Sequence, residues 1–287
     1  MEEQLEERRI RVRCAQLSPR IGDAEGNLEA IETELRLAVE DGVGLLVLPE
    51  LATSGYALTP QEAREVALTA DAPIFRRWLG LLEGSGTTAV LGFCERDPAD
   101  SKAGSDSADV VYNSAVLLTA GAEPVVYRKL HLWDTEKLVF TPGSAAPPIV
   151  QTPVGAVGVV ICYDIEFPEL PRTLALAGAE IVAVPTNWPR RRRPEGEHPH
   201  EVVHAMAAAQ ASGIVIACCD RSGPERGVDW TEGTAIIGAD GWPVGRLDGG
   251  HRLDAELALI PAAERRRISE RNDLFGDRRP EFYRLGT

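Results

Sequence analysis

The stretch GVVICYDIEFPEL, residues 158–170, places a single cysteine at the end of a predicted strand. Residues 156–161 are apolar throughout, which is typical of a strand covered on both faces, and a helical pattern begins near residue 169. A thiol at this junction is held by regular structure on both sides. Cys162 is therefore the candidate nucleophile of an active site.

Two upstream segments present a polar side chain in the same way. The run LLVLPELATSGY, residues 45–56, places Glu50 just after a short aliphatic strand, and VVYRKLHLWDTEKLVFTPG, residues 125–143, places Lys129 at another strand end. Three strand ends thus offer a carboxylate, an ammonium and a thiol. These groups supply a base, an oxyanion stabiliser and a nucleophile, which together suit acyl transfer through a thioester.

Hydrophobic periodicity along the chain alternates between strand-like and helix-like segments. Predicted strands cover residues 9–17, 45–48, 88–93, 110–118, 123–129, 156–161, 180–184, 214–218, 234–238, 245–247 and 255–260. Predicted helices cover residues 28–39, 60–69, 74–82, 169–177 and 201–212. No repeat and no long linker divides the chain, so we expect a layered α/β sandwich in a single domain.

The composition narrows the possible partners. The 287 residues carry a formal net charge of -14, which opposes binding to the phosphate backbone of nucleic acids. No segment approaches the roughly 20 unbroken apolar residues needed to cross a bilayer. The charged N-terminus, MEEQLEERRIRVR, lacks the apolar core of a secretory signal, so we expect a soluble cytoplasmic protein whose five cysteines remain reduced.

The ordered segments PEL with Glu50, YRKLHLW with Lys129, FTPG with Gly143 and CYDIEFPE with Cys162 resemble the nitrilase, or carbon-nitrogen hydrolase, superfamily. The resemblance extends over nearly the whole chain. It implies an αββα sandwich and a Glu-Lys-Cys triad that acts on amides, N-carbamoyl groups or nitriles without a metal or organic cofactor. A second family glutamate matches Glu136, which would help to hold the substrate and the lysine.

The chemistry of the triad follows from its residue types. Cys162 would attack the carbonyl carbon, and the Lys129 ammonium with the backbone N–H of Tyr163 would receive the oxyanion. Glu50 would take the thiol proton, transfer it to the leaving ammonia and later deprotonate the water that cleaves the thioester.

The residues after the nucleophile predict the substrate. True nitrilases usually read CWEN there, whereas CYDIEFPE is similar to the amidase branches, so we expect hydrolysis of primary aliphatic amides. Relatives that take acidic substrates often have arginine three or four residues past the cysteine, where this chain has Ile165 and Glu166. A carboxylate there would favour a neutral or cationic substrate such as an ω-amino amide, unless Glu166 only starts the helix.

The resemblance also implies pocket-lining roles for Tyr56, Trp133, Asn187 and Trp188. It implies a homodimer or higher homo-oligomer, with a core over about residues 9–260 and a C-terminal tail, 261–287, at a subunit contact. N-carbamoyl amide hydrolase or nitrilase activity is the alternative within the superfamily.

Other interpretations are less favoured. A non-catalytic binding or assembly member would not need an intact triad, and a papain-like peptidase would need a different sequence around its cysteine. A metal site built from His198, His200, His204 and Glu201 would place two histidines on one helix face, but PEGEHPHE is typical of a helix start. The arginines at 190–193 predict a solvated loop or a subunit contact, and GAVG at 155–158 predicts a turn into a strand.

Overall fold

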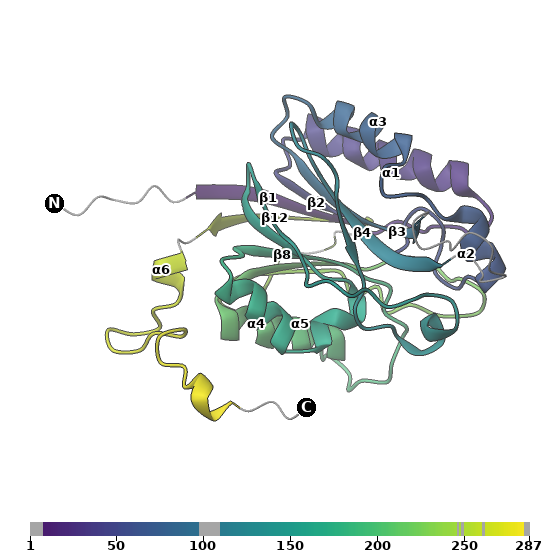
Figure 1. The fold of residues 1–287 in the computed structure, drawn as a ribbon. Helices are drawn as coiled ribbons and strands as arrows, with labels where there is room; N and C mark the ends of the chain where they lie inside the picture. Colours follow the sequence, from purple (N-terminus) through teal and green to yellow (C-terminus); the bar gives the residue numbers. More distant parts are fainter. Residues whose placement is uncertain (1–7, 98–109, 246, 248–249, 260–261, 284–287) are drawn as a thin grey trace.

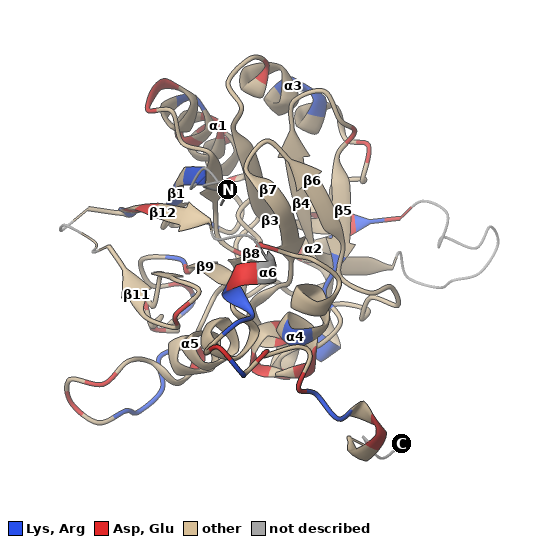
Figure 2. Cartoon of the chain, turned by 90° about the vertical axis from the view of Figure 1, so that its left-hand side faces the viewer, with Lys and Arg blue, Asp and Glu red and all other residues tan. Residues whose placement is uncertain are grey.

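The computed structural model describes residues 8–97, 110–245, 247, 250–259 and 262–283. Two six-stranded sheets pack face to face, and helices cover the outer face of each, which confirms the predicted αββα sandwich (Figure 1). Figure 2 shows that charged residues lie mainly on the helices and loops, whereas the strands between them are largely uncharged. Within the described ranges, no helix is both long enough and apolar enough to span a bilayer.

The first sheet has the strand order β12-β1-β2-β3-β4-β5. Its members are β1 (Arg8–Ala15), β2 (Leu45–Val47), β3 (Thr88–Arg96), β4 (Val111–Thr119), β5 (Val125–Arg128) and β12 (Arg252–Leu259). Strands β1, β2 and β3 run parallel, and the outer pairs are antiparallel. Helices α1 (Ala24–Glu40) and α3 (Pro73–Leu82) lie on its outer face, and the shorter α2 (Pro60–Val66) lies near its end (Figure 1).

The second sheet repeats this plan with the order β11-β10-β9-β8-β7-β6. It contains β6 (Ile149–Thr152), β7 (Gly155–Val159), β8 (Ile181–Pro185), β9 (Val215–Cys219), β10 (Ala235–Ile237) and β11 (Pro243–Val244). Strands β7, β8 and β9 are parallel, and helices α4 (Glu169–Leu176) and α5 (His200–Ser212) cover the outer face. The C-terminal segment carries α6 (Ala262–Arg265) and a 3-10 turn, η4 (Pro280–Phe282), and extends away from the sandwich (Figure 1).

Strand β2 shows why its sequence is continuously aliphatic. Leu45 and Val47 point into the core between the two sheets, whereas Leu46 and Leu48 join the core beneath α1 and α3. Successive side chains of a strand point to opposite faces, so a strand covered on both sides needs an apolar residue at every position. The prediction of a fully covered strand at 45–48 is confirmed.

Three local predictions were wrong in detail. Helix α2 ends at Val66 rather than at residue 69, because Leu68 has turned to extended backbone and bonds with Cys94 and Arg96 of β3. The sequence analysis missed β6, a short edge strand. It also placed a strand at 245–247, whereas β11 occupies Pro243–Val244.

Candidate active site

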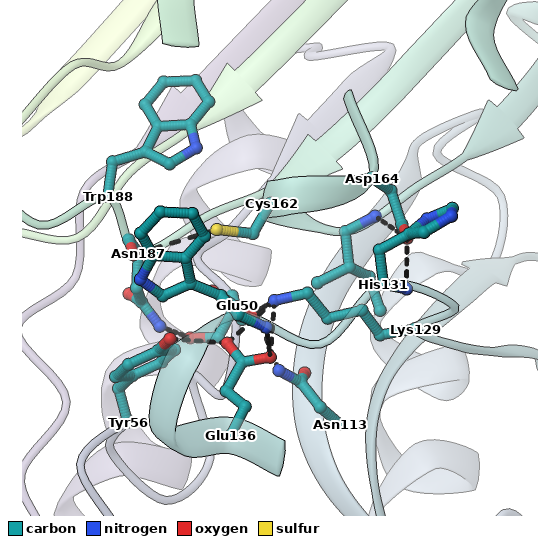
Figure 3. Close-up of polar contacts among 12 residues, drawn as sticks. Glu50, Tyr56, Asn113, Lys129, His131, Glu136, Cys162, Asp164, Asn187 and Trp188 are labelled. Carbon is teal, nitrogen blue, oxygen red and sulfur yellow. Dashed lines mark hydrogen bonds and ion pairs between the residues drawn. The ribbon is translucent and has the colours of Figure 1, made fainter. Parts of the chain in front are cut away.

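The three predicted chemical groups meet where β2, β5 and β7 lead out of their sheets (Figure 3). Lys129 Nζ lies 2.6 Å from Glu50 Oε1 and 2.8 Å from Glu136 Oε1, and all three side chains are buried. Cys162 faces this group from the other sheet, and its thiol is almost fully buried. The structure therefore brings a carboxylate, an ammonium and a thiol from two sheets into one site.

Glu50 is fixed by neighbours on the first sheet and keeps one oxygen available. Asn113 on β4 donates to Glu50 Oε1 at 2.8 Å, and the Asn113 carbonyl accepts the backbone N–H of Lys129. Glu50 Oε2 is buried and has no hydrogen-bond partner among the described residues. Such an oxygen is suited to accept a proton from a group that arrives during the reaction.

The candidate nucleophile occupies a turn with unusual backbone geometry. Cys162 has a φ of 47°, in the left-handed region, and begins a 3-10 helix, η3 (Cys162–Glu166). The backbone N–H of Tyr163 lies in the first turn of η3, where amide groups have no partner within the helix. This N–H is therefore available to stabilise negative charge beside the thiol.

Asp164 ties this turn to the strand that carries Lys129. Its carboxylate accepts from the backbone N–H of Ile161 at 3.1 Å, from the Tyr127 hydroxyl at 2.8 Å and from the backbone N–H of His131 at 3.0 Å. It also lies 2.8 Å from the ring nitrogen Nδ1 of His131. Asp164 was not among the predicted site residues, although it lies two residues after Cys162 in the stretch that identified the candidate nucleophile.

Burial and neighbouring charges set the protonation states. Burial raises the pKa of Glu50 to about 7, although Lys129 partly opposes it. Burial tends to lower the pKa of Lys129, but the charges of Glu136 and Glu50 outweigh it and keep the pKa above its usual value. Burial and the Glu50 charge hold the pKa of the Cys162 thiol well above its usual value. The resting site thus holds an ammonium, a neutral thiol and a carboxyl that titrates near neutrality, as a general base requires.

We predict that kcat/KM rises with pH through an apparent pKa near 7, because only ionised Glu50 can take the thiol proton. Stability should change in the opposite direction. A carboxyl whose pKa is higher in the folded than in the unfolded chain favours folding at acid pH, and this contribution is lost as the pH rises through 7. Rates and unfolding temperatures between pH 5 and 9 test both trends, and a Glu50→Gln variant should lose this part of the stability change. A flat rate profile from pH 5 to 8 would contradict the role of Glu50.

Three of the predicted pocket residues contact Glu50, Glu136 or Cys162. The Tyr56 hydroxyl donates to Glu136 Oε1 at 2.5 Å, and the Trp133 backbone N–H donates to Glu136 Oε2 at 3.1 Å. Asn187 Nδ2 donates to the backbone carbonyl of Glu50 at 2.7 Å, and the Asn187 carbonyl lies 3.8 Å from Cys162 Sγ. Trp188 follows it, and its buried ring points away from Glu50 and Lys129 (Figure 3).

Glu166 lies on the side of the nucleophile turn that faces α5. Its carboxylate is 4.0 Å from Arg191, which bonds to Glu201 at 3.2 Å and lies 5.6 Å above the ring of Trp133. Burial and the charge of Glu201 raise the pKa of Glu166. Glu166 does not start α4, which begins at Glu169. Sequence reasoning missed the connection through Arg191 to the pocket residue Trp133.

The basic run at 190–193 lies on the loop that precedes α5 (Figure 2). One of its arginines, Arg191, is paired with Glu201. In the part of the chain that the structure describes, no group of three or more His, Cys, Asp or Glu residues is arranged to hold a metal ion.

An αββα sandwich with a carboxylate, an ammonium and a cysteine at its strand ends defines a class of hydrolases that cleave carbon–nitrogen bonds. Residues 11–259 match the carbon-nitrogen hydrolase family, and the chain belongs to this family. It is 31% identical over 278 residues to a nitrilase of Pyrococcus abyssi, covering 96% of this chain and 99% of that protein. It is 26% identical over 284 residues to an N-carbamoylputrescine amidase of Solanum tuberosum, covering 92% and 90% of the two chains.

The fold also matches solved structures. An amidase from Nesterenkonia sp. superposes with a TM-score of 0.74 at 28% identity, covering 95% of this chain and 94% of that one. A glutamate-to-glutamine variant of that amidase shows covalent addition of the acetamide moiety of fluoroacetamide at its active-site cysteine. These likenesses agree with the class that the site defines.

Proposed function

We propose that the protein is an amidase that hydrolyses primary aliphatic amides to a carboxylate and ammonia through a thioester on Cys162. The observation that carries the proposal is the convergence of Lys129 and the unpartnered oxygen of Glu50 beside a buried thiol. Covalent addition of the acetamide moiety of fluoroacetamide at the active-site cysteine of the Nesterenkonia amidase supports a nucleophilic role for the thiol here.

In the acylation step, Glu50 takes the proton of the Cys162 thiol while the sulfur forms a bond to the amide carbon. The carbonyl oxygen becomes an oxyanion that Lys129 and the Tyr163 N–H stabilise, and each such donor is typically worth about 3 kcal/mol in the transition state. The intermediate collapses as the carbon–nitrogen bond breaks, and protonated Glu50 gives its proton to the nitrogen. Ammonia leaves, and the acyl group remains on sulfur.

Deacylation uses the same groups in the reverse order. Glu50 takes a proton from a water molecule whose oxygen adds to the thioester carbon, and Lys129 again stabilises the oxyanion. The carbon–sulfur bond breaks, and the thiolate recovers its proton from Glu50. The net reaction adds one water to the amide and restores the starting protonation of the site.

The charges beside the nucleophile support a neutral or cationic substrate. Glu166 and Glu201 place two carboxylates beside the guanidinium of Arg191, so a substrate carboxylate on this side of the turn would lie near both. The name of the potato relative, an N-carbamoylputrescine amidase, refers to a substrate with a distal amine. We therefore propose ω-amino amides as the preferred class, with an N-carbamoyl amine as the alternative.

We predict that 5-aminopentanamide is hydrolysed with at least a tenfold higher kcat/KM than glutaramate, the monoamide of glutaric acid. Two charges about 4 Å apart at an effective dielectric near 20 interact by roughly 4 kcal/mol, and partial exposure of Arg191 reduces this. Glu166→Arg should reverse the order, and Glu166→Gln, which removes the charge with little change of volume, should reduce the preference. Ammonia release with both substrates and with the neutral pentanamide measures the effect.

Equal kcat/KM values for the two charged amides in the wild-type protein would contradict the charge preference. The protein would then be specific for neutral amides. N-carbamoylputrescine and pentanenitrile belong in the same assay. Turnover of either, without turnover of any primary amide, would replace the amidase proposal by the corresponding activity of the family.

We also propose that the chain forms a homodimer, with the C-terminal segment at the subunit contact. This segment extends from the sandwich (Figure 1) and exposes the apolar side chains of Ile268, Phe282 and Tyr283. Arg172 of α4 anchors it through the carbonyl of Leu274 at 2.7 Å. A molar mass in solution equal to that of one chain, measured by light scattering, would contradict the proposal.

A further inference from the structure

Asp220 is a buried carboxylate that the reaction described above does not use. It follows β9 directly, and no part of it is exposed. Strands β8 and β9 are parallel, with Pro185 opposite Cys219, so the residues just beyond the two strand ends are neighbours. Asp220 therefore lies beside the segment 186–188, which passes the catalytic thiol.

The Asp220 carboxylate joins three stretches of backbone. Its Oδ1 accepts from the N–H groups of Trp188 at 3.0 Å and Arg221 at 2.9 Å, and its Oδ2 accepts from the N–H of Gly233 at 2.8 Å. Its own backbone N–H donates to Thr234 Oγ1 at 2.9 Å. Burial raises the pKa of Asp220 to about 7, and the three backbone N–H groups oppose this by stabilising the ionised form.

One of these bonds acts on the peptide group next to the nucleophile. The peptide that joins Asn187 to Trp188 directs its N–H to Asp220 and its carbonyl to Cys162 Sγ, 3.8 Å away. In a planar trans peptide the N–H and the carbonyl point in opposite directions, so holding one orients the other. The Asn187 side chain also bonds to the backbone of Glu50. A rotation of this peptide would therefore disturb both the thiol and the base.

From these contacts we infer that Asp220 is a positioning residue of the active site, which orients the Asn187–Trp188 peptide and thereby the carbonyl that holds the Cys162 thiol in place. Asp220 does not touch the substrate. Its effect on turnover rests on the proposed amidase function, but its effect on the thiol does not.

Two substitutions should give graded effects. Asp220→Ala removes all three acceptor contacts, whereas Asp220→Asn keeps an oxygen for the Trp188 N–H but turns an NH₂ group toward Gly233. We expect kcat for the best amide to fall at least 30-fold in the alanine variant and about 5-fold to 10-fold in the asparagine variant, with KM changed less than threefold. The rate at which iodoacetamide labels Cys162 should fall at least fivefold in the alanine variant.

Intact-mass analysis of the labelled protein also reports folding. All five cysteines are buried, and Cys14, Cys94, Cys218 and Cys219 have no exposed surface. A folded variant should therefore be labelled once, whereas an unfolded one is labelled up to five times. Rates are compared only for protein that is labelled once. If the Asp220→Ala variant does not fold, kcat and the labelling rate of the Asp220→Asn variant test the inference.

Two control variants separate positioning from stability. Thr234→Val removes the hydroxyl that accepts the Asp220 N–H but leaves the carboxylate contacts in place. Glu34→Gln changes another buried carboxylate, which bonds to Arg252 and His251 on the outer side of the first sheet. In both variants, kcat and the labelling rate of Cys162 should stay within twofold of the wild-type values, even where the substitution lowers the unfolding temperature.

Labelling and turnover within twofold of wild type in the folded Asp220 variants would overturn the inference. Equal losses in Glu34→Gln at a similar drop in unfolding temperature would also overturn it, because the effect would then be one of stability alone. If the wild-type protein hydrolyses no amide, the proposed function fails, and the labelling rates still test the role of Asp220.

Discussion

Replacing Cys162 with alanine should abolish amide turnover and leave the fold intact. The substitution removes only the sulfur atom and keeps the Cβ, so it should remove little buried volume. Removing a covalent nucleophile leaves no route through a thioester, and losses near 10⁶-fold are typical for nucleophile deletions. The measurement is ammonia release together with the unfolding temperature.

A second observation locates the intermediate. Under single turnover, the wild-type protein should show a mass increase equal to the acyl group, on a peptide that contains Cys162. Cys94→Ala is the matched control, because Cys94 is also buried and its thiol bonds to a backbone carbonyl, but it lies outside the site. This variant should retain activity. An adduct on Cys218 or Cys219, or full activity of Cys162→Ala, would show that another residue is the nucleophile.

Lys129→Ala and Glu50→Gln should each lower kcat by roughly 10³-fold or more, since an oxyanion donor and a general base act mainly in the transition state. The two variants should differ in stability. Lys129→Ala leaves the carboxylates of Glu50 and Glu136 buried without their cation, and breaking a buried pair in this way costs about 3–5 kcal/mol. Glu50→Gln keeps Asn113 and Lys129 within reach of an amide oxygen and should destabilise less.

Steady-state kinetics and thermal unfolding of both variants check these effects. Activity should also survive exhaustive chelation, because none of the proposed steps uses a metal ion. A loss of activity in EDTA that zinc restores would contradict the mechanism. A Lys129→Ala variant with kcat within tenfold of wild type would remove the lysine from its proposed role.

The layers and the strand ends that carry Glu50, Lys129 and Cys162 could be predicted from the sequence because both depend on local patterns. The aliphatic run before Glu50 and the apolar run before Cys162 identify covered strands, and a polar residue just beyond such a strand lies at the sheet edge. The predicted end of helix α2 was too late in the sequence, because the contact between Leu68 and β3 is a tertiary contact that no local pattern shows.

The supporting residues were missed for a related reason. Asn113, Asp164 and Asp220 act through partners that are distant along the chain. The bonds of Asn113 and Asp220 depend on the order of strands within one sheet, and the bond between Asp164 and Tyr127 depends on how the two sheets pack. A signal was nevertheless present for Asp220. It follows an apolar strand directly, as Lys129 does, and extending the strand-end argument to β9 would have marked it as a candidate.

The left-handed backbone at Leu51 and Cys162, with φ of 49° and 47°, shows how local strain persists for two different reasons. This conformation costs a residue with a Cβ about 1–2 kcal/mol, which glycine would avoid. At residue 51, glycine would also delete a fully buried leucine side chain, and cavities of that kind cost about 2–5 kcal/mol, so packing outweighs the strain. At residue 162, glycine would relax the backbone and remove the thiol. The strained turn next to Glu50 is thus compensated by the packing of a buried side chain, whereas the strained turn at Cys162 retains the thiol that the proposed reaction needs.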